Sequence, residues 1–163
     1  MSNILTTSRV MFEDLAYLAR NMRPDEAAQD MAFSGTDVHD VESSILRMVN
    51  VGGPKFVMFA DGLPILGGGF YCIRPGVWEG WQAGTVAGWN RYWRSITKVT
   101  RRINDEMLAD PNVHRLQLCA MAGREKTFEW YERGLGYRRE ATLHRFCASG
   151  VDAVMFARVK EAA

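Results

Sequence analysis

A change in hydrophobic periodicity near residue 85 constrains the fold of this chain more than any other feature. Before it, residues 55–60, 63–73 and 77–83 form apolar or alternating runs that are typical of β-strands. After it, residues 86–108 carry apolar side chains at helical spacing, and residues 113–119 alternate again. This order predicts a right-handed crossover in which one long helix joins two parallel strands. The apolar stripe of that helix contains Trp89, Tyr92, Trp93, Ile96, Val99, Ile103 and Met107.

Turn signals connect the first three of these strands. Asp61-Gly62 lies between two apolar runs and predicts a tight hairpin. Pro75-Gly76 then separates the second run from the third, so we expect an antiparallel meander. Three glycines at 67–69 interrupt the second run, which predicts either a bulge or the close approach of another backbone or a ligand.

The chain before the meander predicts one strand followed by two or three helices. Residues 3–10 favour a short strand, and the helix that follows has to end before Pro24. Pro24 suits the first turn of a second helix over 25–33, and Gly35 suits its end. The first helix is expected to place Phe12, Leu15, Ala16, Leu18 and Ala19 on one broad face.

A third helix is expected to begin at Thr36 or Asp37 and to end at the glycines 52–53. Its apolar residues predict which side chains it buries. These are Val41, Ile45, Leu46 and Val49.

The last third of the chain predicts a helix over 123–133 and two strands over 137–146 and 151–159. At 163 residues, with 47% hydrophobic and 24% charged residues, the whole chain 1–163 suits one globular domain. The predicted order is one strand, three helices, three strands, a helix, a strand, a helix and two strands.

Charge and length exclude several classes of partner. The net charge of +1 gives no global attraction to nucleic acid or to an anionic membrane, and no sequence-specific nucleic acid partner is expected. No window approaches the roughly 18 apolar residues that a membrane span needs, so we expect a cytoplasmic protein with no membrane partner.

Cysteine and histidine spacing predicts no metal site. Cys72, Cys119 and Cys147 are odd in number and lack a Cys-x-x-Cys pair, so we expect buried free thiols rather than disulfides or zinc ligands. The three histidines are dispersed over different elements and never occur at metal-ligand spacing. They are His39, His114 and His144.

The segment from Glu125 to Tyr137, with the sequence EKTFEWYERGLGY, resembles the Asn-x-x-Ala-x-x-Phe-Tyr-Glu-x-x-Gly-Phe box of the GNAT superfamily of acyl-CoA N-acyltransferases. A strand before it and the closing strand at 152–158 extend this resemblance over essentially the whole chain. The resemblance implies an α/β (α+β) fold with three layers. Its central mixed, mostly antiparallel sheet has about six or seven strands and helices on both faces. It also implies acetyl-CoA as cofactor, bound where the strand 77–83 diverges from 113–119.

The same resemblance suggests two catalytic residues. Tyr131 matches the family tyrosine that protonates the leaving thiolate, and Glu79 stands where a general base removes the proton of the amine. Packing in the core remains the alternative for Tyr131, beside Trp130. An exposed carboxylate at a sheet edge remains the alternative for Glu79.

The family holds the cofactor pyrophosphate on a glycine-rich turn with the pattern Arg/Gln-x-x-Gly-x-Gly/Ala. Here the sequence from Gly84 to Arg91 is GTVAGWNR, so the two glycines have a different spacing and Trp89 is bulky. Phosphate could still bind the free N–H groups at the helix start, and an ordinary helix start is the alternative. Arg124 occupies the family asparagine position, Thr127 occupies the alanine position, and Gly134 adds one residue. The candidate cofactor-binding residues are Val86, Ala87, Gly88, Arg91 and Arg124.

The pentapeptide Asn21-Met22-Arg23-Pro24-Asp25 is similar to a segment of the GNAT-like proteins of short-tailed bacteriophages. Some of those proteins are described as acetyltransferases and others as internal virion proteins. This narrower resemblance implies other virion or protein subunits as partners and packaging in a phage particle made in the host cytoplasm.

Two sets of side chains are candidate interaction surfaces. A basic row on the long helix could meet nucleic acid, an acidic protein or a phosphate, and a solvated helix face is the alternative. A group of tryptophans could form a docking surface, with core packing as the alternative. The basic row is Arg91, Arg94, Lys98, Arg101 and Arg102, and the tryptophans are Trp78, Trp81, Trp89 and Trp93.

Two functional hypotheses result. The first is a degenerate or weakly active acyl-CoA-dependent N-acetyltransferase that serves as a virion or interaction component. The second is a genuine acetyl-CoA-dependent N-acetyltransferase that acts on an amine of a small molecule or a protein.

Overall fold

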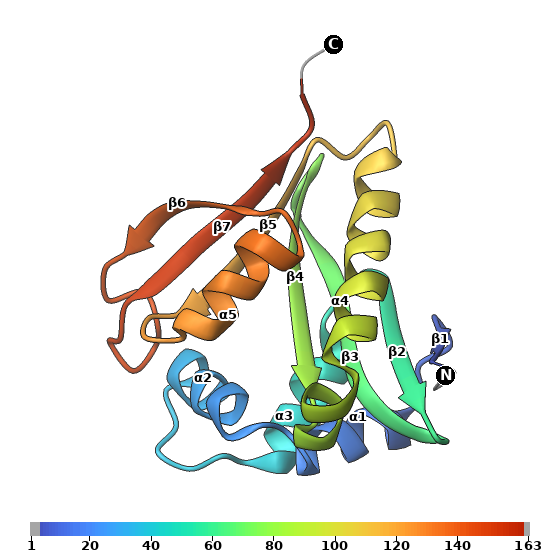
Figure 1. The fold of residues 1–163 in the computed structure, drawn as a ribbon. Coiled ribbons are helices and arrows are strands. Elements are labelled where there is room, and N and C mark those ends of the chain that lie inside the picture. The colour runs from blue at the N-terminus through green and yellow to red at the C-terminus, as the bar shows by residue number, and fades with distance from the viewer. Residues whose placement is uncertain (1–3, 162–163) are drawn as a thin grey trace.

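Seven strands form one sheet in the order β1-β2-β3-β4-β5-β7-β6 in the computed structural model, which describes residues 4–161 (Figure 1). Five neighbouring strand pairs are antiparallel, and the central pair of β4 and β5 is parallel. The predicted element order and the mixed, mostly antiparallel sheet are therefore confirmed. Of the expected first strand, residues 5–7 form β1 (Leu5–Thr7), and Asn3 lies outside the described residues.

The meander is built as its turn residues predict. Strands β2 (Lys55–Ala60) and β3 (Leu63–Arg74) meet at a turn in which Asp61 and Gly62 have φ values of 51° and 78°. Both values lie in the left-handed region, which suits the Asp-Gly pair. Strand β4 (Val77–Gly84) follows and pairs antiparallel with β3.

The three glycines of β3 allow close approach of the chain's own backbone. A Cβ on Gly69 would lie 2.5 Å from the carbonyl oxygen of Pro54, and one on Gly68 would lie 2.8 Å from that of Trp81. The register shifts of β3 lie elsewhere, so of the two expectations close approach is confirmed and a bulge at the glycines is wrong.

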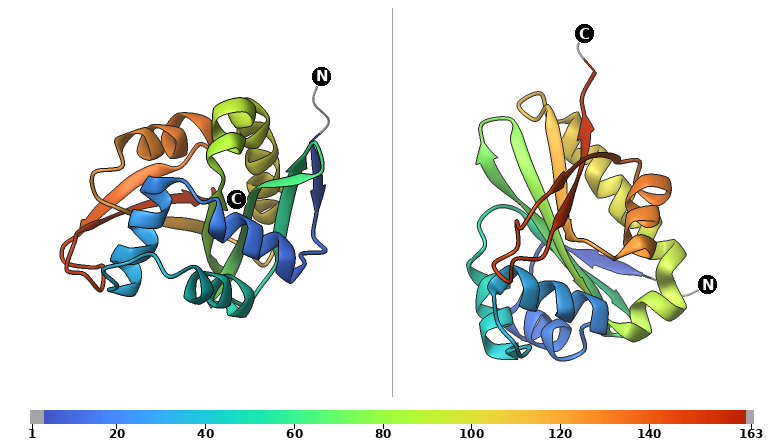
Figure 2. Two further views of the ribbon diagram at one scale, coloured as in Figure 1. Left: turned by 90° about the horizontal axis from the view of Figure 1, so that it is seen from below. Right: turned by 90° about the vertical axis from the view of Figure 1, so that its left-hand side faces the viewer.

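Helices cover both faces of the sheet. Helices α1 (Phe12–Arg20) and α3 (Val41–Asn50) pack with Val57 and Ala83 on one face. Helix α4 (Val86–Ala109) packs on the other face, and α5 (Glu125–Glu129) lies beside it (Figure 2). Helix α2 (Pro24–Ser34) lies near β5 and ends at Gly35, whose φ is 72°.

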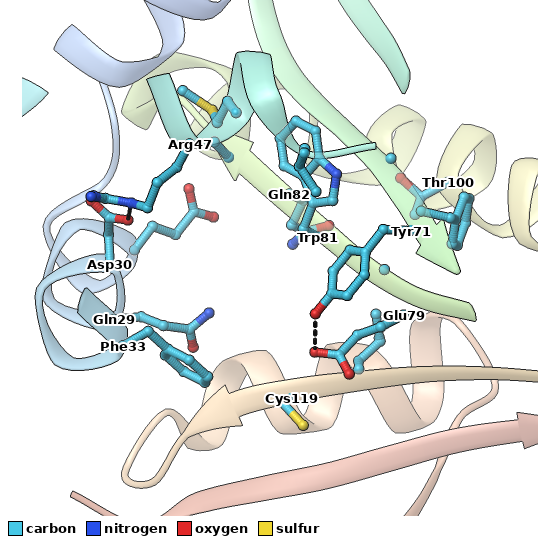
Figure 3. A pocket seen from close by; sticks show the side chains of 18 of the residues that line it. Gln29, Asp30, Phe33, Arg47, Tyr71, Glu79, Trp81, Gln82, Thr100 and Cys119 are labelled. Atoms are coloured by element: carbon cyan, nitrogen blue, oxygen red, sulfur yellow. Dashed lines mark hydrogen bonds and ion pairs between the residues drawn. The ribbon is translucent and has the colours of Figure 1, made fainter. Parts of the chain in front are cut away.

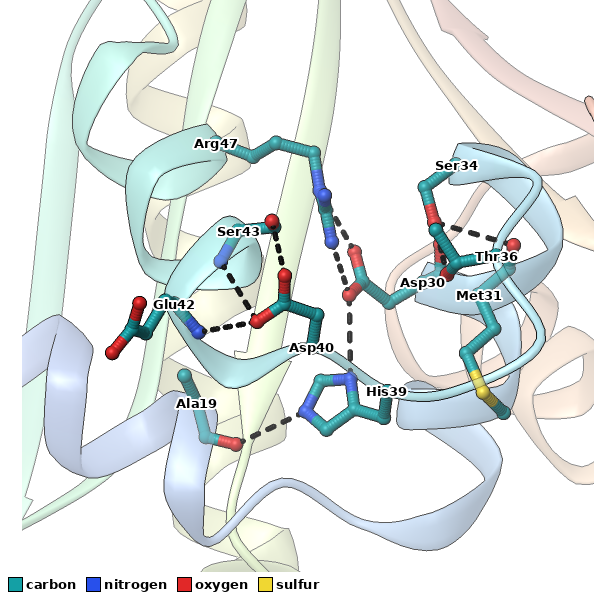
Figure 4. Close-up of polar contacts among 10 residues, drawn as sticks. All are labelled: Ala19, Asp30, Met31, Ser34, Thr36, His39, Asp40, Glu42, Ser43 and Arg47. Atoms are coloured by element: carbon teal, nitrogen blue, oxygen red, sulfur yellow. Dashed lines mark hydrogen bonds and ion pairs between the residues drawn. The ribbon is translucent and has the colours of Figure 1, made fainter.

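The third helix begins later than expected. Asp40 caps it by accepting hydrogen bonds from the backbone N–H groups of Glu42 and Ser43, so the helix starts at Val41 rather than at residue 36 or 37 (Figure 4). Its buried residues are Ser44, Ile45 and Met48. The expected burial of Leu46 and Val49 is wrong, because these side chains lie on the side of the helix that faces away from α1 and are exposed.

The long helix α4 begins at Val86, after the cap residue Thr85. Tyr92 and Ile96 of the expected stripe are buried, but Trp93 is half exposed. The buried stripe continues instead through Thr100 and Asn104, which are polar. Polar side chains can be buried there because they line a cavity, described below.

The C-terminal third contains β5 (Arg115–Met121), β6 (Arg138–Leu143) and β7 (Ala153–Val159). The helix expected over 123–133 is shorter as an α-helix, since α5 gives way to a π-helical turn, η1 (Trp130–Gly134). A π-turn holds more residues than an α-turn, which accommodates the additional residue Gly134.

Strands β4 and β5 separate soon after they meet. They pair over only three positions, from Val77 with Arg115 to Glu79 with Gln117, although both strands continue. The predicted divergence of these two strands is confirmed, and it opens the centre of the sheet.

Candidate active site

A cavity of about 420 Å³ lies where β4 and β5 separate. It is lined from both faces of the sheet, so it passes between the two strands (Figure 3). Tyr71, Glu79 and Cys119 line it on the face of α1 and α3. Thr100 and Tyr131 line it on the face of α4.

Glu79 is held at the last paired position of β4. One carboxylate oxygen accepts a hydrogen bond from the Tyr71 hydroxyl at 2.9 Å, and the other accepts one from Nε2 of Gln117 at 2.9 Å. The residue is half-buried on a central strand, so the alternative of an exposed edge carboxylate is wrong. Two donors fix the carboxylate in the wall of the cavity and leave it further lone pairs.

The hydrogen-bonded chain continues away from the cavity. Arg115 donates from Nε to the Gln117 side-chain oxygen at 3.0 Å and binds both oxygens of Glu140. Gln117 therefore presents its N–H₂ to Glu79, because its oxygen is taken by Arg115. The orientation of the carboxylate rests on four strands, since Tyr71 is on β3, Glu79 on β4, Gln117 on β5 and Glu140 on β6.

Burial and the charge of Glu79 shift the pKa values of two neighbouring groups, the Tyr71 hydroxyl and the Cys119 thiol. Burial, with the Glu79 charge as a further cause, raises the pKa of the Tyr71 hydroxyl well above its ordinary value. The same two causes raise the pKa of the Cys119 thiol to about 12. Both groups therefore stay protonated near neutral pH.

Tyr131 is 4% exposed and packs against the rings of Trp130, Tyr137 and Phe156. Burial raises the pKa of its hydroxyl to about 12. Among residues 4–161 this hydroxyl has no hydrogen-bond partner, and the residue lines the cavity. Tyr131 is thus both a core residue and a protonated donor available to the cavity.

The edge of β4 that faces the opening has free backbone groups only in its middle. The N–H of Thr85 donates to the carbonyl of Ile65 on β3, so the alternating groups of Gly80, Gln82 and Gly84 point the other way, toward the opening. The parallel pairing of Glu79 with Gln117 uses the N–H of Gly80, and Glu26 and Arg23 bind the groups of Gly84, so the open groups are the Gly80 carbonyl and both groups of Gln82. Two buried side-chain atoms of the cavity wall also lack partners within the described chain, the indole N–H of Trp81 and the hydroxyl of Thr100. Unpartnered buried groups of this kind indicate a place for a polar ligand.

The start of α4 is occupied by the chain itself. The Thr85 hydroxyl accepts the N–H of Gly88, and a Cβ on Gly88 would lie 2.5 Å from the carbonyl oxygen of Ile65. Val86 and Ala87 are exposed at the first turn, and Arg91 is directed to Asp61, 3.7 Å away. The role of these four residues in cofactor binding stays a prediction.

Two residues that sequence reasoning did not select lie beside this turn. Glu26 accepts hydrogen bonds from the backbone N–H of Gly84 at 2.6 Å and from the indole of Trp89 at 3.0 Å. Arg23 donates to Glu26 at 2.8 Å and stacks 4.3 Å from the centre of the Trp89 ring. The pentapeptide 21–25 drew attention to this segment, but nothing in the sequence indicates its contacts.

Arg124 joins α2 to the loop after β5. Its guanidinium donates to Asp25 at 2.7 Å and to Gln29 at 2.7 Å, and the residue is buried. It lines the first cavity and also a second cavity of about 770 Å³ between the starts of α4 and α5. The second cavity has an aromatic and basic lining that includes Arg23, Trp89, Trp93, Lys126 and Trp130.

The remaining candidate residues are the four tryptophans, the basic row of α4 and the three cysteines, and they are distributed over the surface and the core. Of the four tryptophans Trp93 is half exposed, while the others are partly buried, so they do not form one exposed surface. The basic row is exposed, apart from contacts of Arg91 with Asp61 and of Arg102 with Glu106. The three cysteines are free, and Cys72 is exposed rather than buried.

Residues 4–161 contain no cluster of three or more His, Cys, Asp or Glu side chains that could hold a metal ion. Within the same range no helix combines the length and apolar character needed to cross a membrane.

Comparisons by sequence found no matching protein-family model and no matching curated protein. Comparison by structure found extensive likeness. A GNAT-family acetyltransferase from Bacillus anthracis has a TM-score of 0.74 at 13% identity, over 99% of this chain and 98% of its own.

Two further structures cover similar lengths. The aminoglycoside acetyltransferase AAC(6')-Ib, in complex with ribostamycin and coenzyme A, has a TM-score of 0.71 at 16% identity, over 96% of this chain and 93% of its own. A ribosomal-protein-alanine N-acetyltransferase from Brucella melitensis has a TM-score of 0.70 at 17% identity, over 95% and 99%. At these identities the likeness shows that this chain has the GNAT fold.

Proposed function

We propose that this protein is an acyl-CoA-dependent N-acetyltransferase. The observation that carries the proposal is the cavity between β4 and β5, with the fixed carboxylate of Glu79 on one face and the free hydroxyl of Tyr131 on the other. The GNAT fold adds support, because AAC(6')-Ib is a structural neighbour that was solved with coenzyme A and with acetyl-CoA.

The open edge of β4 suits the pantetheine arm of acetyl-CoA. Pantetheine is an extended chain with two amides. Gln82 offers its backbone N–H and C=O groups, and Gly80 offers its C=O group, as a neighbouring strand would. The unpartnered indole N–H of Trp81 and hydroxyl of Thr100 add polar groups to the lining of the same cavity. The basic and aromatic second cavity, which shares Arg124 with the first, suits the nucleotide end. When bound, acetyl-CoA supplies an acetyl group activated as a thioester.

Glu79 acts as the general base in this proposal. Its carboxylate accepts the proton that the amine loses as it attacks the thioester carbonyl carbon. The bonds from Tyr71 and Gln117 keep the carboxylate oriented toward the cavity while this happens. Holding both reactants in one cavity contributes further to the rate.

Tyr131 acts on the leaving sulfur. A hydroxyl with a pKa of about 12 remains protonated at any working pH, so it donates a hydrogen bond to the negative charge that develops on sulfur. A thiol has a pKa of roughly 8.5, which makes complete proton transfer from this tyrosine unfavourable. Stabilisation by hydrogen bonding is therefore the role we assign to Tyr131, with the final proton taken from solvent.

The test combines binding with turnover. We expect calorimetry to detect acetyl-CoA binding, and we expect a thiol-release assay to show acetyl transfer to at least one amine in a panel. The panel contains ribostamycin, spermidine and a peptide with an N-terminal alanine, chosen because acetyltransferases of similar structure are named for such acceptors or were solved with them. Absence of acetyl-CoA binding at millimolar concentration would reject the proposal.

A second candidate function is a non-catalytic component of a virion or another assembly. One observation favours it, namely that Arg23 and Glu26 already occupy the end of β4 next to the pentapeptide 21–25. Packaging in a phage particle belongs to this candidate. It predicts no thioester binding and co-purification with a larger assembly, so the calorimetric experiment separates the two functions.

A further inference from the structure

The carboxylate of Glu26 lies between the two cavities. Glu26 lines the first cavity, while Arg23 and Trp89, which both donate hydrogen bonds to it, line the second. Its other oxygen accepts the N–H of Gly84, the last residue of the open β4 edge. A ligand that follows the β4 edge from the first cavity toward the second therefore comes close to this carboxylate.

The contacts of Glu26 indicate that it is ionised. Its three partners are the guanidinium of Arg23, the indole N–H of Trp89 and the N–H of Gly84, and all three are donors. A protonated carboxyl group would direct its own hydrogen at a donor, which costs a hydrogen bond. Glu26 is 6% exposed, so solvent screens its negative charge only weakly.

The groups around Glu26 come from several elements. Arg23 and Asp25 lie at the start of its own helix, Arg124 lies in the loop after β5, and Tyr131 lies on the π-helical turn. Burial raises the pKa of Glu26 above its ordinary value, although Arg23 and the Gly84 N–H oppose this effect. The carboxylate therefore takes up a proton at a higher pH than an exposed glutamate would.

Three of the donors that a second anion would use here are already bonded. Glu26 holds the Gly84 N–H, Thr85 holds the Gly88 N–H, and Arg23 is paired with Glu26. Binding of a diphosphate beside this carboxylate brings like charges together in a poorly screened position. A neutral chain that follows the β4 edge only as far as Gln82 meets no such repulsion.

We infer that Glu26 is a specificity-determining residue that disfavours donors with an anionic diphosphate, such as acyl-CoA, relative to neutral pantetheine thioesters. The inference rests on the proposed function, because it concerns which thioester the cavity accepts. The inference assigns discrimination against the coenzyme to one side chain, Glu26, rather than to the glycine spacing of the turn.

The test measures binding, not turnover. Calorimetry gives the Kd of 3'-dephospho-CoA and of pantetheine for the wild type, for Glu26→Gln and for Glu42→Gln, which removes an exposed glutamate at the first turn of α3. The diphosphate of dephospho-CoA stays ionised at all pH values used. In Glu26→Gln we expect the affinity for dephospho-CoA to rise by about fivefold or more, the low end of ordinary coupling between two groups. We expect pantetheine affinity to change less than about twofold, and Glu42→Gln to resemble the wild type.

Each other outcome has a distinct meaning. Unchanged or weaker binding of dephospho-CoA to Glu26→Gln, with pantetheine still bound, overturns the role of Glu26 and leaves the proposed function intact. No binding of either ligand to any variant overturns the proposed function, and this inference with it.

A wild-type measurement covers the case in which Glu26→Gln fails to fold. The ratio of dephospho-CoA affinity to pantetheine affinity is measured from pH 8 to pH 4.5, because burial raises the pKa of Glu26 above its ordinary value of 4.5. Because protonation removes the negative charge of Glu26, we expect the ratio to rise as the pH falls. A constant or falling ratio overturns the inference.

Discussion

The two ends of the β4 edge that faces the opening differ although they belong to one strand. The carbonyl of Gly80 and both backbone groups of Gln82 face the cavity, and Glu79 lies beside them in a fixed orientation. At Gly84 the same row of groups is closed by Glu26 and by the N–H of Arg23, which donates to the Gly84 carbonyl at 3.1 Å. The open end offers donors and acceptors to a ligand, whereas the closed end has satisfied them within the chain.

This difference shows that the place of acyl transfer and the way the donor is held are separate properties, although both depend on the GNAT fold. The fold places a carboxylate and a strand edge where acyl transfer can occur, but it does not determine how the donor is held at the start of α4. The side chains that lie there, Arg23 and Glu26, come from the start of α2 and are far from β4 in the sequence. In the proposed function, catalytic capacity and donor preference therefore depend on different parts of the chain.

The largest expected effect concerns the open end. Replacement Glu79→Gln removes the general base but keeps an acceptor for Tyr71, so we expect kcat to fall by about 100-fold or more. KM for the donor should change little. Steady-state thiol release checks both constants, and Glu106→Gln, an exposed glutamate on α4, is the matched control. Equal loss in the two variants would show that the open end is not the site of chemistry.

The next effect concerns the packing of the closed end. Gly88→Ala would place a Cβ against the carbonyl oxygen of Ile65, a backbone atom that cannot move alone, so we expect a loss of about 2 kcal/mol in the free energy of unfolding. Gly52→Ala is the control, because nothing lies within 4 Å of its Cβ position. Urea denaturation measures both. A stability of Gly88→Ala equal to that of the control would mean that the start of α4 is not held against β3.

A smaller effect concerns the hydrogen bond that orients Glu79. Tyr71→Phe leaves the ring but removes one donor to the carboxylate, and we expect a loss of about 1 kcal/mol of stability. We also expect kcat to fall several-fold while thioester binding persists. Denaturation and thiol release measure the two effects. If kcat stays at the wild-type value, the orientation of Glu79 does not depend on Tyr71.

The smallest effect is a pH dependence at the closed end. Asp25 is half exposed, and burial raises its pKa, but the hydrogen bond and charge of Arg124 outweigh burial and hold the pKa below the ordinary value of 3.8. A depressed pKa stabilises the fold above pH 3.8, and this contribution disappears as the pH falls through the lowered value. Solvent screening limits it to about 0.5 kcal/mol. Asp25→Asn should flatten stability between pH 5 and pH 2 relative to the wild type in thermal melts.

The order of elements was predictable because it depends on local patterns. Three local signals determine where elements begin and end, and the structure contains all of them. They are the Asp-Gly turn, the apolar stripe of the long helix and the glycine after α2. The divergence of β4 from β5 was also expected, through the resemblance. The predicted start of α3 was wrong because a cap residue determines it. Asp40 caps the helix, so α3 begins later than its apolar pattern suggests.

The site was less predictable because its contacts are distant or depend on register. A two-residue turn at Pro75-Gly76 would place Cys72 opposite Glu79, but a register shift between Cys72 and Arg74 brings Tyr71 there instead. The contact of Glu26 with Gly84 joins residues 58 positions apart and has no local signature. Thr100 and Asn104 were missed because their burial depends on the cavity.

Amide hydrogen exchange along β4 shows whether the open edge holds the donor. With saturating acetyl-CoA, or with acetyl-pantetheine if the coenzyme binds weakly, we expect slower exchange of the Gln82 amide. The amides of Gly80 and Gly84 should be protected already, because the pairing of Glu79 with Gln117 uses the first and Glu26 accepts the hydrogen bond of the second. Unchanged exchange at Gln82 in the presence of a bound thioester would contradict binding of the donor along the open edge of β4.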